Sequence, residues 1–187
     1  SGDPAGSLFL CPASRHVRAM FLSVVIPTYN RLPILQKCLR ALEQQQLEAP
    51  ISAYEVVVVD DGSTDDTVNW LLLNGSEFPH VRLVQQDHGG PAEGRNRGVD
   101  HARGDVIVFI DSDLVVTPTF LSCHAKALER HWQRAGHRRC FTYGAVINTA
   151  NFSDPTSEPH KLRDLSWAYF ATGNVAIDRA LLVGAGL

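Results

Sequence analysis

The sequence lacks the features that mark several large classes of protein. No apolar run approaches the roughly 20 residues that a membrane-spanning helix needs. Basic residues are not in excess, because the formal net charge is -3. This argues against a general nucleic-acid binder, whose affinity for phosphate requires a basic surface. No internal repeat is present, so the pattern that remains is that of an ordinary globular protein.

Cysteine is scarce as well. The four cysteines are widely spaced and form no C-x-x-C pair: Cys11, Cys38, Cys123 and Cys140. Neither a zinc site nor a disulfide framework is therefore indicated. Reduced thiols are typical of cytosolic proteins, so we expect a cytoplasmic location. A substrate that is associated with a membrane remains compatible with the sequence.

Length and composition fit one domain with a substantial core. The chain has 187 residues, of which 44% are hydrophobic and 20% charged, as is usual for globular domains. Residues 1–20 show no clear period and carry glycine and proline. We expect them to be a weakly ordered extension, either native or left from cloning. Residues 21–187 are expected to form the domain.

Short apolar runs alternate with helical patterns through the first 113 residues. Strands are predicted over 22–26, 54–59, 81–84 near a sheet edge, and 106–110. Three helices are predicted between them. Their marks are the apolar stripe of Leu35, Cys38, Leu39 and Leu42, the face of Val68, Leu71 and Leu72 with Ser63 as N-cap, and the pattern over 92–102. This order predicts an α/β fold with a Rossmann-like, mainly parallel sheet and helices on both faces.

The second half is patterned less clearly. Pro118 opens a predicted helix with Leu121, Ala125, Leu128 and Trp132 on one side. A strand is predicted over 141–147, and residues 165–170 fit either a strand or an irregular aromatic segment. A short helix is expected from Asp178.

The strand over 106–110 stops at Asp111, Ser112 and Asp113. In an extended backbone alternate side chains share a face, so Asp111 and Asp113 are expected to point the same way. Two hard oxygen donors at the end of a buried strand suit Mg²⁺ or Mn²⁺. The alternative is that these residues only end a strand and start a turn.

Other predicted strands also end in polar residues. Residues 28–30 and the pair Asp60 and Asp61 follow two of them, and a loop with Gly89 and Gly90 lies nearby. In open α/β sheets, ligands bind outside the carboxyl ends of the strands. Adjacent residues on a strand face opposite ways, so only one of the two aspartates should face the cleft, and we choose Asp61. Its alternative role is turn formation.

Four segments together resemble the inverting family 2 glycosyltransferases of the GT-A fold: residues 24–30, 58–63, 94–98 and 111–113. The resemblance covers residues 22 to 186. It implies a nucleotide-sugar donor, with uracil as the expected base, and Mn²⁺ or Mg²⁺ as cofactor. The acceptor would be a glycan, a lipid-linked molecule or a small molecule.

The same resemblance implies a role for each matched position. Pro27, Thr28, Tyr29 and Asn30 would line the nucleoside pocket, and Asp61 would accept a hydrogen bond from the base. Gly90 and Arg95 would lie near the nucleotide, and Asp111 and Ser112 near the ribose or donor sugar. Asp113, with Asp111, would bind the metal that bridges the diphosphate. Gly173 and Asn174 would lie on the acceptor side.

The general base of the family is missing from this pattern. Its acidic motif is expected beyond Leu187, so we expect a truncated domain that binds donor without robust transfer. Two other functions stay open. One is a sugar nucleotidyltransferase, although residues 27–31 lack the glycine-rich phosphate loop of such enzymes. The other is a non-catalytic module that binds nucleotide or carbohydrate.

Overall fold

The computed structural model describes residues 18–151, 153–154, 157, 165–166 and 173–186. Six strands of this part of the chain form one sheet in the order β3-β2-β1-β4-β8-β5. Their bounds are β1 Met20–Thr28, β2 Ile51–Asp60, β3 Val81–Gln85, β4 Val106–Ile110, β5 Phe141–Tyr143 and β8 Asn174–Asp178. A separate antiparallel pair consists of β6 Val146–Ile147 and β7 Leu165–Ser166.

The sheet is mainly parallel. β1 pairs in parallel with β2 and β4, and β2 pairs in parallel with β3 at the edge. β8 runs antiparallel to both β4 and β5. The predicted α/β class is confirmed. β1 begins at the buried Met20, one residue before the expected start of the domain.

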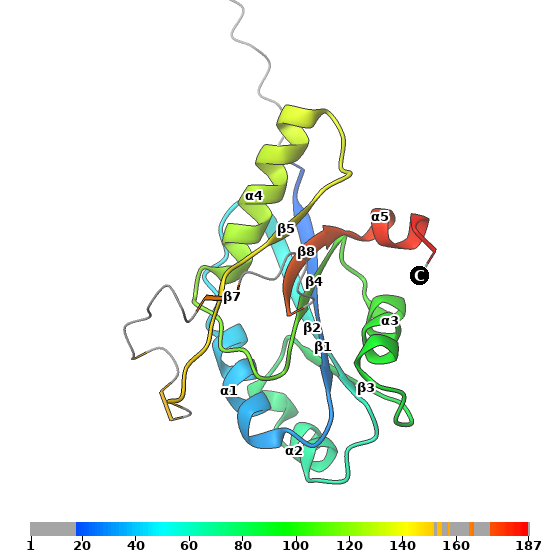
Figure 1. The fold of residues 1–187 in the computed structure, drawn as a ribbon, viewed down its shortest axis with the longest axis vertical. Helices are drawn as coiled ribbons and strands as arrows, with labels where there is room; N and C mark the ends of the chain where they lie inside the picture. The colour runs from blue at the N-terminus through cyan, green and yellow to red at the C-terminus, as the bar shows by residue number, and fades with distance from the viewer. Residues whose placement is uncertain (1–17, 152, 155–156, 158–164, 167–172, 187) are drawn as a thin grey trace, which may run out of the picture.

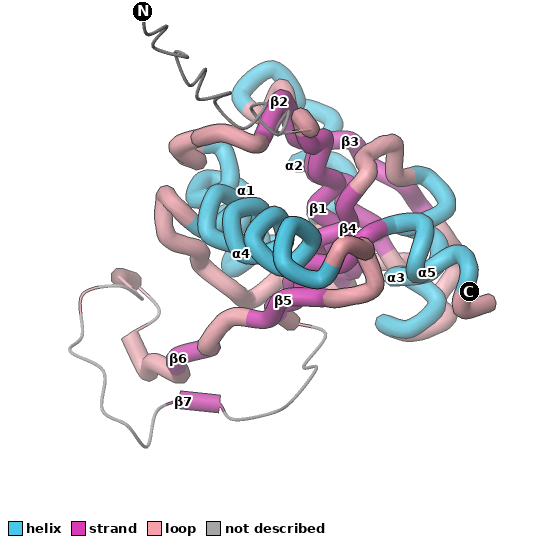
Figure 2. Tube along the Cα trace, turned by 90° about the horizontal axis from the view of Figure 1, so that it is seen from above, coloured by secondary structure: helices cyan, strands magenta, loops and turns pink. Residues whose placement is uncertain are grey.

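Helices cover both faces of the sheet (Figures 1 and 2). One face carries α1 Leu32–Glu43, α2 Thr67–Leu73 and α4 Phe120–Ala135. The other carries α3 Pro91–His101 and α5 Arg179–Gly184. A 3-10 turn, Gly75–Glu77, follows α2. Of the helices that the structure describes, none combines the length and apolar character that crossing a bilayer requires.

The central strands are buried on both sides, which explains their unbroken apolar runs. In β1, Leu22, Val24 and Ile26 belong to the core under α1, α2 and α4. Val25 belongs to the core under α3 and α5. All five residues of β4 are buried as well. The polar residues that follow β1 and β4 are therefore held by strands that cannot shift without exposing core.

The predicted helix faces are largely confirmed. All four residues of the α1 stripe are buried. In α4, Leu121, Ala125 and Leu128 are buried, and Trp132 packs against the same core while partly exposed. α4 begins at Phe120, two residues after the proline that was expected to open it.

The predicted start of the second helix is wrong. The Ser63 hydroxyl accepts the backbone N–H of Asn30 at 3.0 Å instead of capping a helix. α2 begins at Thr67, whose backbone N–H donates to Asp65 Oδ1 at 3.1 Å. The later start turns Thr67 and Leu71 inward and leaves Leu72 68% exposed, so Leu72 does not belong to the buried face.

The strand predicted over 141–147 is interrupted. β5 ends at Tyr143 and β6 begins at Val146. Gly144 lies so close to the Asn174 amide that a Cβ atom there would overlap it. The Gly144 N–H still donates to the Asn174 carbonyl at 3.2 Å, and the pairing with β8 ends there because β8 begins at Asn174. Residues 165–166 form β7, and residues 167–170 of the undecided aromatic segment lie outside the described part.

Two glycines bring α3 close to the sheet. A Cβ atom at Gly94 would lie 3.1 Å from the Cβ of Pro27. A Cβ atom at Gly98 would overlap Cγ1 of Val25, which is completely buried. The first turn of α3, which opens the site described below, is thus placed by this close packing.

We expect Gly98→Ala to lower the free energy of unfolding by about 1–2 kcal/mol. Overpacking costs about 1–3 kcal/mol, and the overlap with a completely buried side chain places this case at about 2–3 kcal/mol, which exceeds the gain of about 1 kcal/mol in helix propensity. Urea denaturation measures the change. Gly75→Ala is the matched control, because a Cβ atom there meets nothing within 4 Å. Equal stability of Gly98→Ala and wild type would contradict the packing argument.

Candidate functional site

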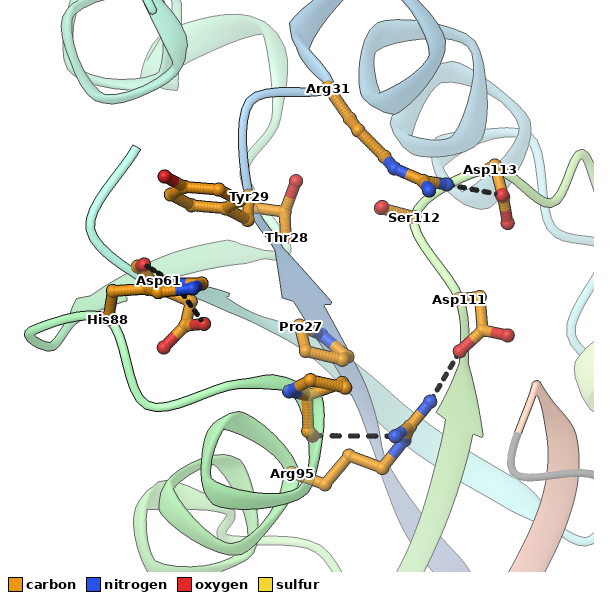
Figure 3. A pocket seen from close by; sticks show the side chains of 11 residues that line it. Pro27, Thr28, Tyr29, Arg31, Asp61, His88, Arg95, Asp111, Ser112 and Asp113 are labelled. Atoms are coloured by element: carbon orange, nitrogen blue, oxygen red, sulfur yellow. Dashed lines mark hydrogen bonds and ion pairs between the residues drawn. The ribbon is translucent and has the colours of Figure 1, made fainter. Parts of the chain in front are cut away.

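A cavity of about 410 Å³ lies at the carboxyl ends of β1, β2 and β4 (Figure 3). Eight of the predicted site residues line it: Pro27, Thr28, Tyr29, Asp61, Arg95, Asp111, Ser112 and Asp113. Three further residues line it that the sequence did not single out as site residues: Arg31, His88 and Pro91. The parallel sheet thus brings together residues more than 80 positions apart in the chain.

Asn30 and Gly90 are not among the lining residues but hold the walls of the cavity. Asn30 adopts a left-handed conformation with φ 51°. Its Oδ1 accepts the backbone N–H groups of Thr64 at 2.7 Å and Asp65 at 3.2 Å. Asn30 therefore ties the loop after β1 to the loop after β2. Gly90, at φ 92°, leads into α3.

The Asp61 carboxylate is buried and accepts three hydrogen bonds. Oδ1 accepts from Gln86 Nε2 at 2.7 Å and from the Gly89 N–H at 2.8 Å. Oδ2 accepts from the Gly90 N–H at 2.9 Å and lies 2.9 Å from His88 Nδ1. Burial alone would raise the pKa of Asp61, but these hydrogen bonds and the His88 charge outweigh it and lower the pKa below its usual value.

The choice between the two aspartates at the end of β2 follows from their contacts. Asp61 lines the cavity. Asp60 is buried and accepts the Ser63 N–H at 3.1 Å, so it forms the turn that was the alternative role of Asp61.

Each of the two acids after β4 is paired with an arginine. Arg95 of α3 lies 2.6 Å from Asp111 Oδ1, and Arg31, just before α1, lies 2.5 Å from Asp113 Oδ2. The two arginines come from opposite faces of the sheet. The extended geometry expected for residues 111–113 is wrong, because the strand ends at Ile110 and the Leu114 N–H donates to the Asp111 carbonyl in a turn. Both carboxylates nevertheless line one cavity.

Gly173 and Asn174, although adjacent in the chain, contact different parts of the structure. Gly173 packs against Asp111, where a Cβ atom would lie 2.6 Å from Oδ2. Asn174 is buried, and its Oδ1 lies 2.9 Å from His124 Nε2. His124 Nδ1 lies 2.7 Å from the Thr142 hydroxyl, and burial lowers the pKa of His124. Asn174 thus joins β8 to α4 and faces a second hollow of about 340 Å³.

The comparison with known proteins identifies the family. The family model described as "Glycosyl transferase family 2" matches residues 23–182. The chain belongs to glycosyl transferase family 2.

Relatives of this family 2 chain are named glycosyltransferases. The uncharacterized glycosyltransferase YibD of Escherichia coli K12 is 38% identical over 98 residues, which is 52% of this chain and 27% of that protein. The glycosyltransferase AglE of Haloferax volcanii is 35% identical over 111 residues, 59% of this chain and 34% of that protein. The matched part thus spans about a quarter to a third of the length of such relatives.

Two solved structures resemble the chain. S. aureus TarS 1-349 in complex with UDP-GlcNAc has 32% identity and a TM-score of 0.53, over 60% of this chain and 32% of that one. The mannosyltransferase PcManGT of Pyrobaculum calidifontis, in complex with GDP-Man and Mn²⁺, has 25% identity and a TM-score of 0.62. The match covers 90% of this chain and 47% of that one. The family 2 domain has the GT-A fold that was predicted.

The acids after β4 fit a divalent cation. In the described part of the chain, no group of three or more His, Cys, Asp or Glu side chains could hold a metal by itself. Mg²⁺, however, is commonly bound through one or two carboxylates together with substrate phosphates. Asp111 and Asp113 are both partly exposed to the cavity, with 44% and 47% of their side chains accessible. Two hard oxygen donors beside an open space meet that requirement.

Replacing Asp61 tests the contribution of its buried carboxylate to stability. We expect Asp61→Asn to lower the free energy of unfolding at pH 7 by about 2 kcal/mol, because a buried charged acceptor with several donors is removed. A lowered pKa in the folded state stabilises the protein above the unfolded pKa of about 3.9, and this stabilisation is lost as the pH falls through the folded value. The difference from wild type should therefore shrink below about pH 4.

Urea denaturation between pH 3 and pH 7 measures this difference. The exposed Asp100→Asn on α3 is the control and should stay close to wild type at every pH. A pH-independent deficit of Asp61→Asn would show that its charge is not what stabilises the loop.

Proposed function

We propose that the chain is the donor-binding part of a glycosyltransferase that moves a sugar from a UDP-sugar to an acceptor hydroxyl with inversion and with Mn²⁺ or Mg²⁺. One observation carries the proposal: an aromatic wall, a buried carboxylate and two acid–arginine pairs meet in a single cavity of a family 2 domain. The UDP-GlcNAc and GDP-Man complexes of similar structures support a nucleotide-sugar donor.

The nucleoside would bind at the end of the cavity that Tyr29 and Asp61 form. Tyr29 is 41% exposed and offers a ring face on which a base can stack. Asp61 is an ionised acceptor, which suits a ring N–H such as that of uracil. Pro27 and Thr28 continue this wall along β1.

The diphosphate would bind between the acids after β4 and the two arginines. A bound cation would neutralise charge on the leaving diphosphate, and Asp113 with Asp111 would hold it. Arg31 and Arg95 would donate hydrogen bonds to phosphate oxygens, for which a guanidinium is well shaped. Asp111 and Ser112 would then lie beside the ribose or the donor sugar.

The general base is proposed to be a carboxylate other than the three in the cavity. Asp61 is held by backbone N–H groups, and Asp111 and Asp113 would hold the cation in the donor complex, so none of the three would be available to take the proton of an acceptor hydroxyl. Gly173 lies directly against Asp111, where a side chain would overlap the carboxylate, and we place the acceptor side next to this contact.

Metal-dependent UDP binding tests the proposal. We expect UDP to bind in Mn²⁺, and Asp113→Asn to weaken this binding at least tenfold, which is about 1.4 kcal/mol. Isothermal titration calorimetry with UDP, GDP, UTP and their sugars, with and without Mn²⁺, measures the effect. Asp100→Asn is the control and should bind like wild type.

Other outcomes would favour other functions. Preference for UTP would indicate a nucleotidyltransferase, and metal-independent binding of a glycan would indicate a binding module. If Asp113→Asn bound UDP as tightly as wild type in Mn²⁺, the proposed metal site would be wrong.

A further inference from the structure

The His88 side chain lies over Tyr29 inside the cavity. The ring centroids are 4.2 Å apart and the planes meet at 28°, which is a stacked arrangement (Figure 3). The His88 side chain is 57% exposed, so burial does not force it into this position. Stacking on Tyr29 and the interaction with Asp61 hold it there.

The neighbours of His88 fix which nitrogen carries a proton. Nδ1 lies 3.1 Å from the backbone carbonyl of Asp61 and 2.9 Å from its carboxylate Oδ2. Both neighbours are acceptors only, so Nδ1 carries the hydrogen. His88 therefore presents to Asp61 a flat heterocycle with a ring N–H.

Asp61 has no uncovered acceptor position for a ligand. An ionised carboxylate offers about four lone-pair sites, and Gln86, Gly89 and Gly90 occupy three of them. The His88 ring covers the remaining site on Oδ2, because its Nδ1 lies 2.9 Å from that oxygen while its hydrogen bond goes to the Asp61 backbone carbonyl. A base that donates an N–H to the Asp61 carboxylate must therefore displace one of these four groups.

Of these groups, His88 is the one that moves away most easily. The Gly89 and Gly90 donors are backbone N–H groups at the entrance to α3. The Gln86 amide is partly buried, with its Oε1 enclosed by protein. The His88 ring is already more than half exposed and can turn into water by rotation of its side chain.

We infer that His88 occupies the base subsite in the absence of donor and that an entering base displaces it. The inference rests on the proposed function and goes beyond it, because it assigns a role to His88. The base that can replace this ring is flat and carries a ring N–H, as uracil and guanine do. Cytosine and adenine present a ring nitrogen acceptor at the corresponding edge and would face the carboxylate unfavourably.

Removal of the His88 ring should make the subsite easier to enter. We expect His88→Ala to bind UDP about three- to tenfold more tightly, the effect of losing one aromatic stack. Isothermal titration calorimetry with UDP and Mg²⁺ measures this change. Affinity for CDP should stay far below that for UDP in both proteins.

His80 provides a matched control. It stacks on Tyr54 with the same 4.2 Å between ring centroids, but neither residue lines the cavity. His80→Ala should leave UDP affinity unchanged once its folded fraction is verified by circular dichroism. If His80→Ala and His88→Ala both bound UDP more tightly than wild type, loss of any such stack would loosen the domain. This result would overturn the inference.

A second measurement needs no substitution. In wild-type protein, the Hε1 proton of His88 should carry the ring-current shift of Tyr29 and lose it on saturation with UDP and Mg²⁺. Pyrophosphate with Mg²⁺ has no base and should leave this resonance in place.

The outcomes separate the inference from the proposed function. UDP binding in which His88→Ala is equal to or weaker than wild type, or in which the His88 resonance stays in place, overturns the inference and leaves the proposed function standing. Failure of UDP to bind wild type and His88→Ala alike overturns the proposed function, and the inference with it.

Discussion

The buried Asp61 carboxylate is the interaction on which the geometry of the site depends. It follows β2 directly, and its three hydrogen-bond donors and the nearby His88 ring come from the segment that joins β3 to α3. A buried charge is costly unless it is fully paired, so the segment must close over it in one arrangement. This closure places the start of α3 and, through that helix, Arg95 opposite Asp111.

The sheet supplies the fixed frame for this closure. β1 and β4 are neighbours with both faces buried, so the polar residues that follow them emerge side by side at one edge. Gly94 and Gly98 let α3 approach the same sheet closely. Rigid strands and a closely packed helix thus set the positions of groups that loops alone would leave undefined.

The elements that sequence could predict are those governed by burial and topology. The run over 106–110 is apolar because β4 has no exposed face, and the α1 stripe repeats because one side of that helix is buried. Tyr29, Asp61 and Asp111 could be predicted at one site because the carboxyl ends of neighbouring parallel strands meet at one edge. The remaining features depend on residues distant in sequence. The start of α2 is displaced because the Ser63 hydroxyl binds Asn30, 33 positions away. No local period encodes such a pairing, and the direction of the His88 ring likewise follows only from where the Asp61 carboxylate lies.

Charge pairing explains how three carboxylates can share one cavity. Asp111, Asp113 and Asp61 would repel one another and a nucleotide diphosphate, yet each has a nitrogen partner in Arg95, Arg31 or His88. In the proposed function, donor binding is therefore an exchange of partners, not the filling of unsatisfied groups. Because the ion pairs and hydrogen bonds broken within the protein offset part of those formed with the ligand, affinity for the nucleotide reflects a difference between two well-paired states. Selectivity then rests on ligands that replace all the partners at once: a ring N–H for His88, and a cation with phosphate oxygens for the arginine pairs.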